Sequence, residues 1–355
     1  MAALSALSAQ LKADDFTSIP IIDMTDAAHP DASRRHAVAM EIRAACLNQG
    51  FFYLKNHGVP KAVADAAFDQ SKAFFGSGNE VKRSIDISKS DNFRGYMGVL
   101  MENNDPTNKG DYHEAFNLGL DPSLAPESMG TEGSGDSKMQ HGANAWPQSQ
   151  VWPGADEFKS TTLQYYSSIL GLGQRLFPLI ALALDLPESF FDDKIQHPAA
   201  IMRLLYYPER EVGADEKMPG IGAHTDFECF TILRQDDNGT VPALQVANRH
   251  GEWLDAKCIP DTFVVNIGDQ LARWTNDIFV STRHRVLPTV GRDRYSIPFF
   301  FGCDHDVVMD PIPTCVSEER PNKYEVMTAG DYVHMRLTDI YAAGVKGGPD
   351  ANGSS

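Results

Sequence analysis

The run His224-Thr-Asp226 places an imidazole and a carboxylate two residues apart. If the run is a strand, both side chains point to the same face and can bind one metal ion. A third ligand must come from elsewhere, and His284, in the strand-like segment Ser281-Thr-Arg-His-Arg-Val, is the candidate. Two imidazoles and one carboxylate form the facial triad of non-haem Fe(II) oxygenases, which leaves coordination positions open for a chelating co-substrate and O2.

A His-x-Asp pattern alone is weak evidence for a metal site. The sequence contains two similar patterns, His29-Pro-Asp31 in a polar N-terminal loop and His250-Gly-Glu252 in a hairpin turn. A solitary histidine such as His284 is also more often structural than ligating. The metal-site hypothesis therefore depends on companion residues.

The companion is Arg294-Tyr-Ser296, ten residues after His284. In a strand Arg294 and Ser296 share one face, where a guanidinium fork and a hydroxyl can bind one carboxylate. This arrangement suits the distal carboxylate of 2-oxoglutarate, whose keto-acid end would chelate the iron. The alternative is an ion pair of Arg294 beside a structural serine, but the combined patterns favour the co-substrate site.

Length and composition limit the number of domains and the classes of protein to which the chain can belong. The 355 residues, 42% hydrophobic and 22% charged, are typical of a globular protein with two domains or one large one. No apolar run reaches the roughly 18 residues of a transmembrane helix, and the N-terminal residues lack the pattern of a secretory signal.

Charge and cysteine content predict the partners and the compartment. The net charge of −17 disfavours nucleic acid and membrane surfaces, so a small-molecule substrate is expected. Five cysteines without a CxxC motif argue against disulfides and zinc–thiolate sites and favour free thiols in the cytoplasm. The sequence does not indicate an oligomeric state.

The chain divides into four predicted segments. Residues 1–120 form an N-terminal region with strands near 20–23 and 50–54 and helices near 38–49 and 60–75. Residues 121–155 form a Gly/Ser/Pro-rich loop, either an active-site lid or mobile filler. Residues 156–345 contain a long helix (156–184) with Pro178 inside it, short strands between 201 and 308, and a last helix from 328; 346–355 are a disordered tail. Many short strands separated by turns predict an antiparallel sandwich or barrel with helices on one side.

Nearly the whole chain resembles the isopenicillin N synthase-like family of Fe(II)/2-oxoglutarate-dependent dioxygenases. The resemblance is carried by PIIDM, GFFYLKNHGVP, KAFF and NFRGY in the N-terminal region and by RLLYYP, GAHTDF, ALQV, STRHRV and RYSIPFF further on. It implies a mainly β fold with flanking helices, whose core is a distorted double-stranded β-helix (jelly roll) in residues 156–345. It also implies that Tyr207 binds 2-oxoglutarate with Arg294 and Ser296. The sequence departs from the family pattern at one position: many plant members have Asn two residues before this Tyr, and here the residue is Leu205.

The resemblance implies an enzyme that uses Fe(II), 2-oxoglutarate and O2. It would oxidise a small organic molecule by hydroxylation, desaturation or ring rearrangement, with release of succinate and CO2. A secondary-metabolite intermediate is the expected substrate, and a thymine-type pyrimidine is an alternative. Two further alternatives are an Fe(II) oxidase that does not use 2-oxoglutarate and a non-catalytic jelly-roll ligand-binding protein.

Five other side chains are candidates for the substrate pocket. Phe227 follows Asp226 directly, and Phe300 stands six residues after Arg294. Tyr96 and Phe116 lie in the N-terminal region that relatives fold over the metal, and Arg94 is a candidate anchor for a polar group of the substrate. Core packing is the alternative for the aromatic residues, and a surface ion pair is the alternative for Arg94.

Overall fold

A computed structural model describes residues 16–124, 142–211, 213, 215, 217–236 and 242–345. The predicted tail (346–355), the first fifteen residues, residues 237–241 and the middle of the predicted 121–155 loop lie outside the described residues.

Eight strands of the described residues form one large sheet. Their order is β1 (Ile21–Asp23), β2 (Phe51–Lys55), β10 (Phe263–Ile267), β7 (Phe230–Gln235), β12 (Arg294–Phe301), β5 (Ala200–Tyr207), β4 (Glu114–Gly119) and β3 (Gly95–Met97). The β1–β2 pair is parallel and the other pairs are antiparallel. Strands of the predicted N-terminal region thus extend both edges of the sheet formed by the later strands. The boundaries at residues 120 and 155 stay predictions.

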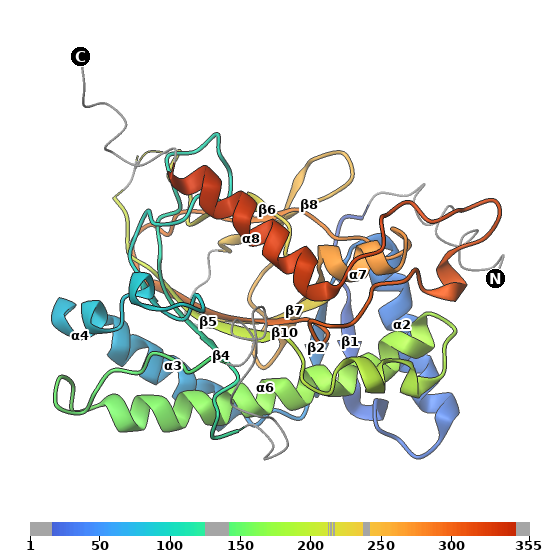
Figure 1. Ribbon diagram of the computed structural model, residues 1–355, viewed down its shortest axis with the longest axis horizontal. Helices are drawn as coiled ribbons and strands as arrows, with labels where there is room; N and C mark the ends of the chain where they lie inside the picture. The colour runs from blue at the N-terminus through green and yellow to red at the C-terminus, as the bar shows by residue number, and fades with distance from the viewer. Residues whose placement is uncertain are drawn as a thin grey trace.

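A second sheet of four strands has the order β6 (Ile221–His224), β11 (His284–Val286), β8 (Leu244–Ala247) and β9 (Trp253–Asp255). The helices are α2 (Ala32–Asn48), α3 (Lys61–Phe75), α4 (Asn79–Ser84), α6 (Ala155–Ala183), α7 (Asp269–Trp274) and α8 (Ala329–Val345). Figure 1 shows α2, α3 and α6 on one side of the large sheet, with the small sheet and α8 on the other. The expected mainly β fold with flanking helices is confirmed, as two sheets that do not close on each other.

Two apolar layers hold this arrangement together. The larger one packs α2, α3 and α6 against the large sheet, through residues such as Ile42, Phe74, Phe177 and Phe299. The smaller one lies between the two sheets and includes Val246 and Val264. Burying such side chains contributes about 1.5–3 kcal/mol each, so the sheets are fixed relative to each other before any ligand binds.

The predicted helices are confirmed, although α2 begins six residues before its predicted start at 38. The helix predicted near 38–49 is α2, and Gly50 follows it with φ of +64°. A Cβ atom at Gly50 would lie 2.3 Å from the Val280 carbonyl oxygen, so only glycine allows this close approach. The last helix is capped as its sequence indicates, because the Asp331 amide donates to Thr328 Oγ1 at 3.1 Å.

Candidate iron and co-substrate site

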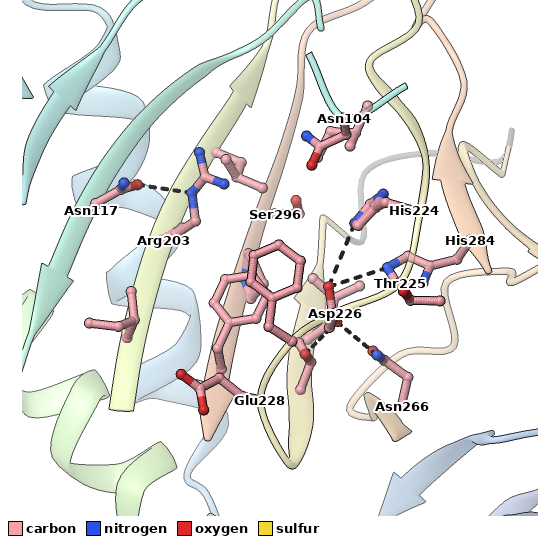
Figure 2. A pocket seen from close by; sticks show the side chains of 18 of the residues that line it. Asn104, Asn117, Arg203, His224, Thr225, Asp226, Glu228, Asn266, His284 and Ser296 are labelled. Atoms are coloured by element: carbon pink, nitrogen blue, oxygen red, sulfur yellow. Dashed lines mark hydrogen bonds and ion pairs between the residues drawn. The ribbon is translucent and has the colours of Figure 1, made fainter. Parts of the chain in front are cut away.

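A cavity of about 220 Å³ lies between the two sheets. Alternate residues of neighbouring strands face it, as the two-residue period of a strand requires. From β12 these are Arg294, Ser296, Pro298 and Phe300, and from β5 they are Ile201, Arg203, Leu205 and Tyr207. His224, Asp226 and His284 lie on the opposite wall, and Val333 and Leu337 of α8 close one side. Figure 2 shows how several of these side chains converge.

His224, Asp226 and His284 form one compact cluster. Asp226 Oδ1 lies 3.6 Å from His224 Nε2 and 3.7 Å from His284 Nε2. One ligand atom from each residue lies within 4.8 Å of the others, a spacing that could hold a metal ion. Two imidazoles and one carboxylate on one side of a point are the donor set of non-haem Fe(II) oxygenases.

The reason for this convergence differs in part from the sequence prediction. His224 is the last residue of β6, and Asp226 lies beyond the strand end. His224 and Asp226 are therefore not brought together by a shared strand face. The segment that follows β6 brings them together. Likewise β11 begins only at His284, which is the direct antiparallel partner of His224.

Hydrogen bonds orient each of the three side chains. Nδ1 of His224 donates to the Gly222 carbonyl at 2.8 Å, and Nδ1 of His284 donates to the Thr282 carbonyl at 3.1 Å. In the neutral imidazoles each Nε2 therefore carries the lone pair that can bind a metal, and protonation of His224 at Nε2 lets this atom donate to Asp226 instead.

Asp226 is oriented by its other oxygen. Oδ2 accepts hydrogen bonds from Asn266 Nδ2 at 2.7 Å and from Thr231 Oγ1. Figure 2 shows Asn266 and the imidazoles approaching Asp226 from different sides. The sequence analysis missed Asn266 and Thr231, although Asn266 is a polar residue within the apolar strand Phe-Val-Val-Asn-Ile.

The electrostatics of the cluster favour the metal-binding forms of Asp226 and His284, but not that of His224. Burial opposes the ionisation of Asp226, yet the His284 charge and the His224 contacts hold the pKa of Asp226 well below its usual range. Burial, with the neighbouring His224, lowers the pKa of His284 to about 4. Burial also opposes the charge on His224, but the hydrogen bond to Asp226 outweighs it and raises the pKa of His224. At neutral pH, Asp226 is thus ionised and His284 is neutral, as metal ligation requires.

Arg294, Ser296 and Tyr207 gather at the other end of the cavity. Arg294 pairs with Tyr207 across β12 and β5, and its guanidinium lies 4.7 Å from the Tyr207 ring centroid. Ser296 Oγ donates to the Tyr207 hydroxyl at 3.4 Å. Leu205, the departure from the plant pattern, is the register partner of Ser296 and lines the same cavity.

The Arg294 guanidinium lacks an acidic partner in the described part of the chain. It is 3% exposed, Nη1 has no hydrogen-bond partner, and Nη2 makes only a 3.4 Å contact with Gln235 Oε1. Such a group is costly to bury unless an anion pairs with it. The carboxylate of a dicarboxylic acid fits this position, with hydroxyls of Ser296 and Tyr207 beside it.

The five candidate substrate residues separate into two groups. Phe227 and Phe300 line the cavity. Tyr96, Phe116 and Arg94 do not. Phe116 packs in an aromatic cluster with Phe74 and Phe158, away from the cavity.

Tyr96 and Arg94 make contacts of their own. Tyr96 donates to Glu114 Oε2 at 2.8 Å, and Arg94 donates to the carbonyls of Leu120 and Gly142. Arg94 is buried, so the surface ion pair considered for it is not what the structure shows.

A polar network that the sequence analysis missed lines the cavity near β4 and β5. Arg203 donates to Glu102 Oε2 at 2.8 Å and to Asn117 Oδ1 at 2.9 Å. His113 Nε2 lies 3.3 Å from the same Glu102 oxygen. The sequence gives little sign of this, because Glu102 and Arg203 are 101 residues apart.

This network predicts a specific loss of stability in acid. Burial opposes the charge of Glu102, but Arg203 and His113 lower its pKa from 4.5 to about 2. Its stabilisation is present above pH 4.5 and is lost as the pH falls towards 2, because the unfolded chain binds the proton first. We expect a loss on the order of 2 kcal/mol between pH 5 and pH 3.

Urea unfolding at both pH values, for the wild type and for Glu102→Gln, measures this contribution. The wild type should lose more of its free energy of unfolding than the variant does over this pH interval. Equal losses would show that Glu102 does not carry the effect.

Within the described residues, no helix has the length and apolarity needed to cross a bilayer.

Comparison with known proteins identifies the family. Residues 19–149 match a family described as "non-haem dioxygenase in morphine synthesis N-terminal", and residues 198–302 match the "2OG-Fe(II) oxygenase superfamily". The chain is 36% identical to "2-oxoglutarate-Fe(II) type oxidoreductase ppzC" of Metarhizium rileyi, over 93% of this chain and 90% of the relative. It is 34% identical to "Homoarginine-6-hydroxylase 2-ODD-C23" of Glycine max, over 88% of this chain and 93% of that protein.

A solved structure gives the same result. A full-length Neurospora crassa protein, crystallised in complex with alpha-KG and thymine, superposes with a TM-score of 0.77, at 29% identity, over 91% of this chain and 97% of that one. These matches confirm the resemblance, the jelly-roll fold class and the requirement for Fe(II), 2-oxoglutarate and O2. The chain belongs to the 2OG-Fe(II) oxygenase superfamily and is a 2-oxoglutarate-dependent Fe(II) dioxygenase.

Proposed function

We propose that His224, Asp226 and His284 hold the ferrous ion and that Arg294, Ser296 and Tyr207 hold 2-oxoglutarate. The observation that carries this assignment is the Arg294 guanidinium, which has no acidic partner among the described residues and lines the same cavity as the His/Asp/His cluster. The two sets occupy separate parts of one cavity, as a chelating co-substrate with a distal carboxylate requires.

The roles of the side chains follow from the geometry. The loaded iron centre supplies the oxidation of a C–H bond, in which substrate, O2 and 2-oxoglutarate become hydroxylated substrate, succinate and CO2. Asn266 and Thr231 fix the Asp226 carboxylate so that one oxygen remains for the metal. Arg294 orients the co-substrate through its distal carboxylate. Phe227 and Phe300 form apolar walls that exclude water from the reacting centre.

The substrate is a small organic molecule, and we propose a secondary-metabolite intermediate. The mainly apolar cavity supports this size and character. The names of the relatives include a homoarginine hydroxylase, and a structural neighbour contains thymine, so the fold alone does not select the substrate. A thymine-type pyrimidine stays the alternative, and direct incubation with thymine tests it.

We propose a cytoplasmic location, with neither nucleic acid nor membrane as partner. All five cysteines are free and four of them are buried, which suits a reducing compartment. The net charge of −17 opposes binding to phosphate backbones and anionic lipids.

An assay of the purified protein tests the proposal. With Fe(II), 2-oxoglutarate and O2, we expect succinate to form in a 1:1 ratio with the 2-oxoglutarate consumed. O2 consumption that proceeds unchanged without 2-oxoglutarate would instead favour the Fe(II) oxidase alternative. Ligand binding with no succinate formed would favour a non-catalytic binding protein.

A further inference from the structure

The carboxyl group of Glu228 is a second buried ionisable group that lines the cavity, and it has no cationic partner among the described residues. Glu228 is 7% exposed and lines the cavity two residues after Asp226. Its Oε2 has no hydrogen-bond partner among the described residues. Figure 2 shows the side chain turned away from the His/Asp/His cluster.

The backbone is shaped to accommodate this carboxyl group. A Cβ atom at position 302 would lie 1.9 Å from Glu228 Oε2, so a larger residue at 302 would displace the carboxyl group from this position. Ala199 borders the same space, because its Cβ atom lies 3.2 Å from the position that a Cβ at residue 302 would take. The carboxyl group therefore occupies a defined niche at the end of β12.

Glu228 and the co-substrate anchor lie at opposite ends of the cavity. Arg294 is the first residue of β12, and Gly302 directly follows its last residue. Eight strand residues span about 26 Å, with Ser296, Pro298 and Phe300 facing the cavity between them. The co-substrate clamped at Arg294 thus leaves the Glu228 end for the substrate, beside the aromatic walls.

Once the proposed ligands are bound, the other acidic and basic groups of the cavity are paired, and Glu228 is the acidic group that still lacks a cationic partner. The Arg203 guanidinium is matched by Glu102 at 2.8 Å. The Asp226 carboxylate and the two carboxylates of 2-oxoglutarate are matched by Fe(II) and Arg294. Apart from the histidines, which include His305, no other ionisable Asp, Glu, Lys or Arg of the described residues lines the cavity.

From this placement we infer that the substrate carries a basic nitrogen, an ammonium or guanidinium group, which pairs with Glu228 while the substrate's apolar part packs against Phe227 and Phe300. Burial disfavours the ionised form of the Glu228 carboxyl group. A cation held against this group stabilises that form, and a neutral group does so less well. The acidic surface, with net charge −17, also raises the local concentration of cations. This inference rests on the proposed function, because the charge balance assumes bound Fe(II) and 2-oxoglutarate.

Calorimetry with a matched pair of probes tests the inference. Enzyme loaded with Mn(II) and 2-oxoglutarate, without O2, is titrated with butylguanidine and with butylurea, which share a shape and N–H donors but differ in charge. We expect the wild type to bind butylguanidine at least about tenfold more tightly, which corresponds to about 1.4 kcal/mol. In Glu228→Gln this preference should disappear. Glu319→Gln removes an exposed charge outside the cavity and should keep the preference.

Several outcomes would overturn the inference. Equal affinity for the two probes, no measurable binding of butylguanidine, or a preference that survives Glu228→Gln each contradicts it. If Glu228→Gln does not fold, Gly302→Ala serves instead, because its Cβ displaces the Glu228 carboxyl group and should weaken butylguanidine binding. Failure of Mn(II) or 2-oxoglutarate to bind would contradict the proposed function, whereas titration of the unloaded protein would still report on Glu228.

Discussion

Asp226→Ala is expected to lose Fe(II) binding and to form succinate about a thousandfold more slowly than the wild type, because a metal-assisted step worth several kcal/mol is removed. Asp226 lies within 3.7 Å of both imidazoles and is the only anionic member of the cluster that the described residues form. Without it, two neutral imidazoles remain, and a divalent cation loses its charge-neutralising ligand. Calorimetry with Mn(II) and a succinate assay measure the two effects.

The matched control comes from the other His-x-Asp pattern. Asp31 caps α2 by accepting the Ser33 amide hydrogen bond at 2.9 Å. Asp31→Ser removes that carboxylate but keeps a good capping residue, so Mn(II) affinity and succinate formation should stay at wild-type values. Full activity of Asp226→Ala, or an equal loss in both variants, would refute the assignment of the metal ligands.

Arg294→Ala is expected to weaken 2-oxoglutarate binding by about 2–5 kcal/mol, which is about 30-fold to several thousandfold. The reason is that Arg294 is the cation at its end of the cavity and has no competing acidic partner among the described residues. Mn(II) affinity in the absence of 2-oxoglutarate should not change, since Arg294 belongs to the other end of the cavity. Titration with each ligand separates the two effects.

Arg292→Ala is the control for this variant. It removes a positive charge two residues away, from a side chain that does not line the cavity. Unchanged 2-oxoglutarate affinity in Arg294→Ala would show that the arginine is not the co-substrate anchor. If such a variant also consumed O2 without 2-oxoglutarate, the oxidase alternative would gain support.

Local sequence patterns were sufficient for much of the fold. The apolar periodicity of Val38, Ile42 and Cys46 gave α2, and the stripe from Tyr165 to Ile180 gave α6. The short strands after residue 200 appear close to their predicted places. These features depend on neighbours within one or two turns, so the residue order alone contains the information.

Spacing along the chain was less informative about the candidate site. Arg294 and Ser296 do share one face of β12, as their i and i+2 positions indicate. The same argument does not apply to His224 and Asp226, because β6 ends at His224. Tyr96, Phe116 and Arg94 were candidates because of their place in the N-terminal region and not because of spacing, and they do not line the cavity. Proximity to the cavity depends there on how the N-terminal strands pack.

By itself, the sequence determined the donor types of this protein: two histidines, an aspartate and an Arg-x-Ser pair, together with the local helices and strands that contain them. Only the tertiary structure decided which of these groups meet. The antiparallel pairing of β6 with β11 brings His284 opposite His224, and the packing of two sheets encloses Glu228 without a partner. The physical reason is that metal, co-substrate and substrate contacts join segments distant in sequence, and their distances are set by sheet register and layer packing rather than by any local periodicity.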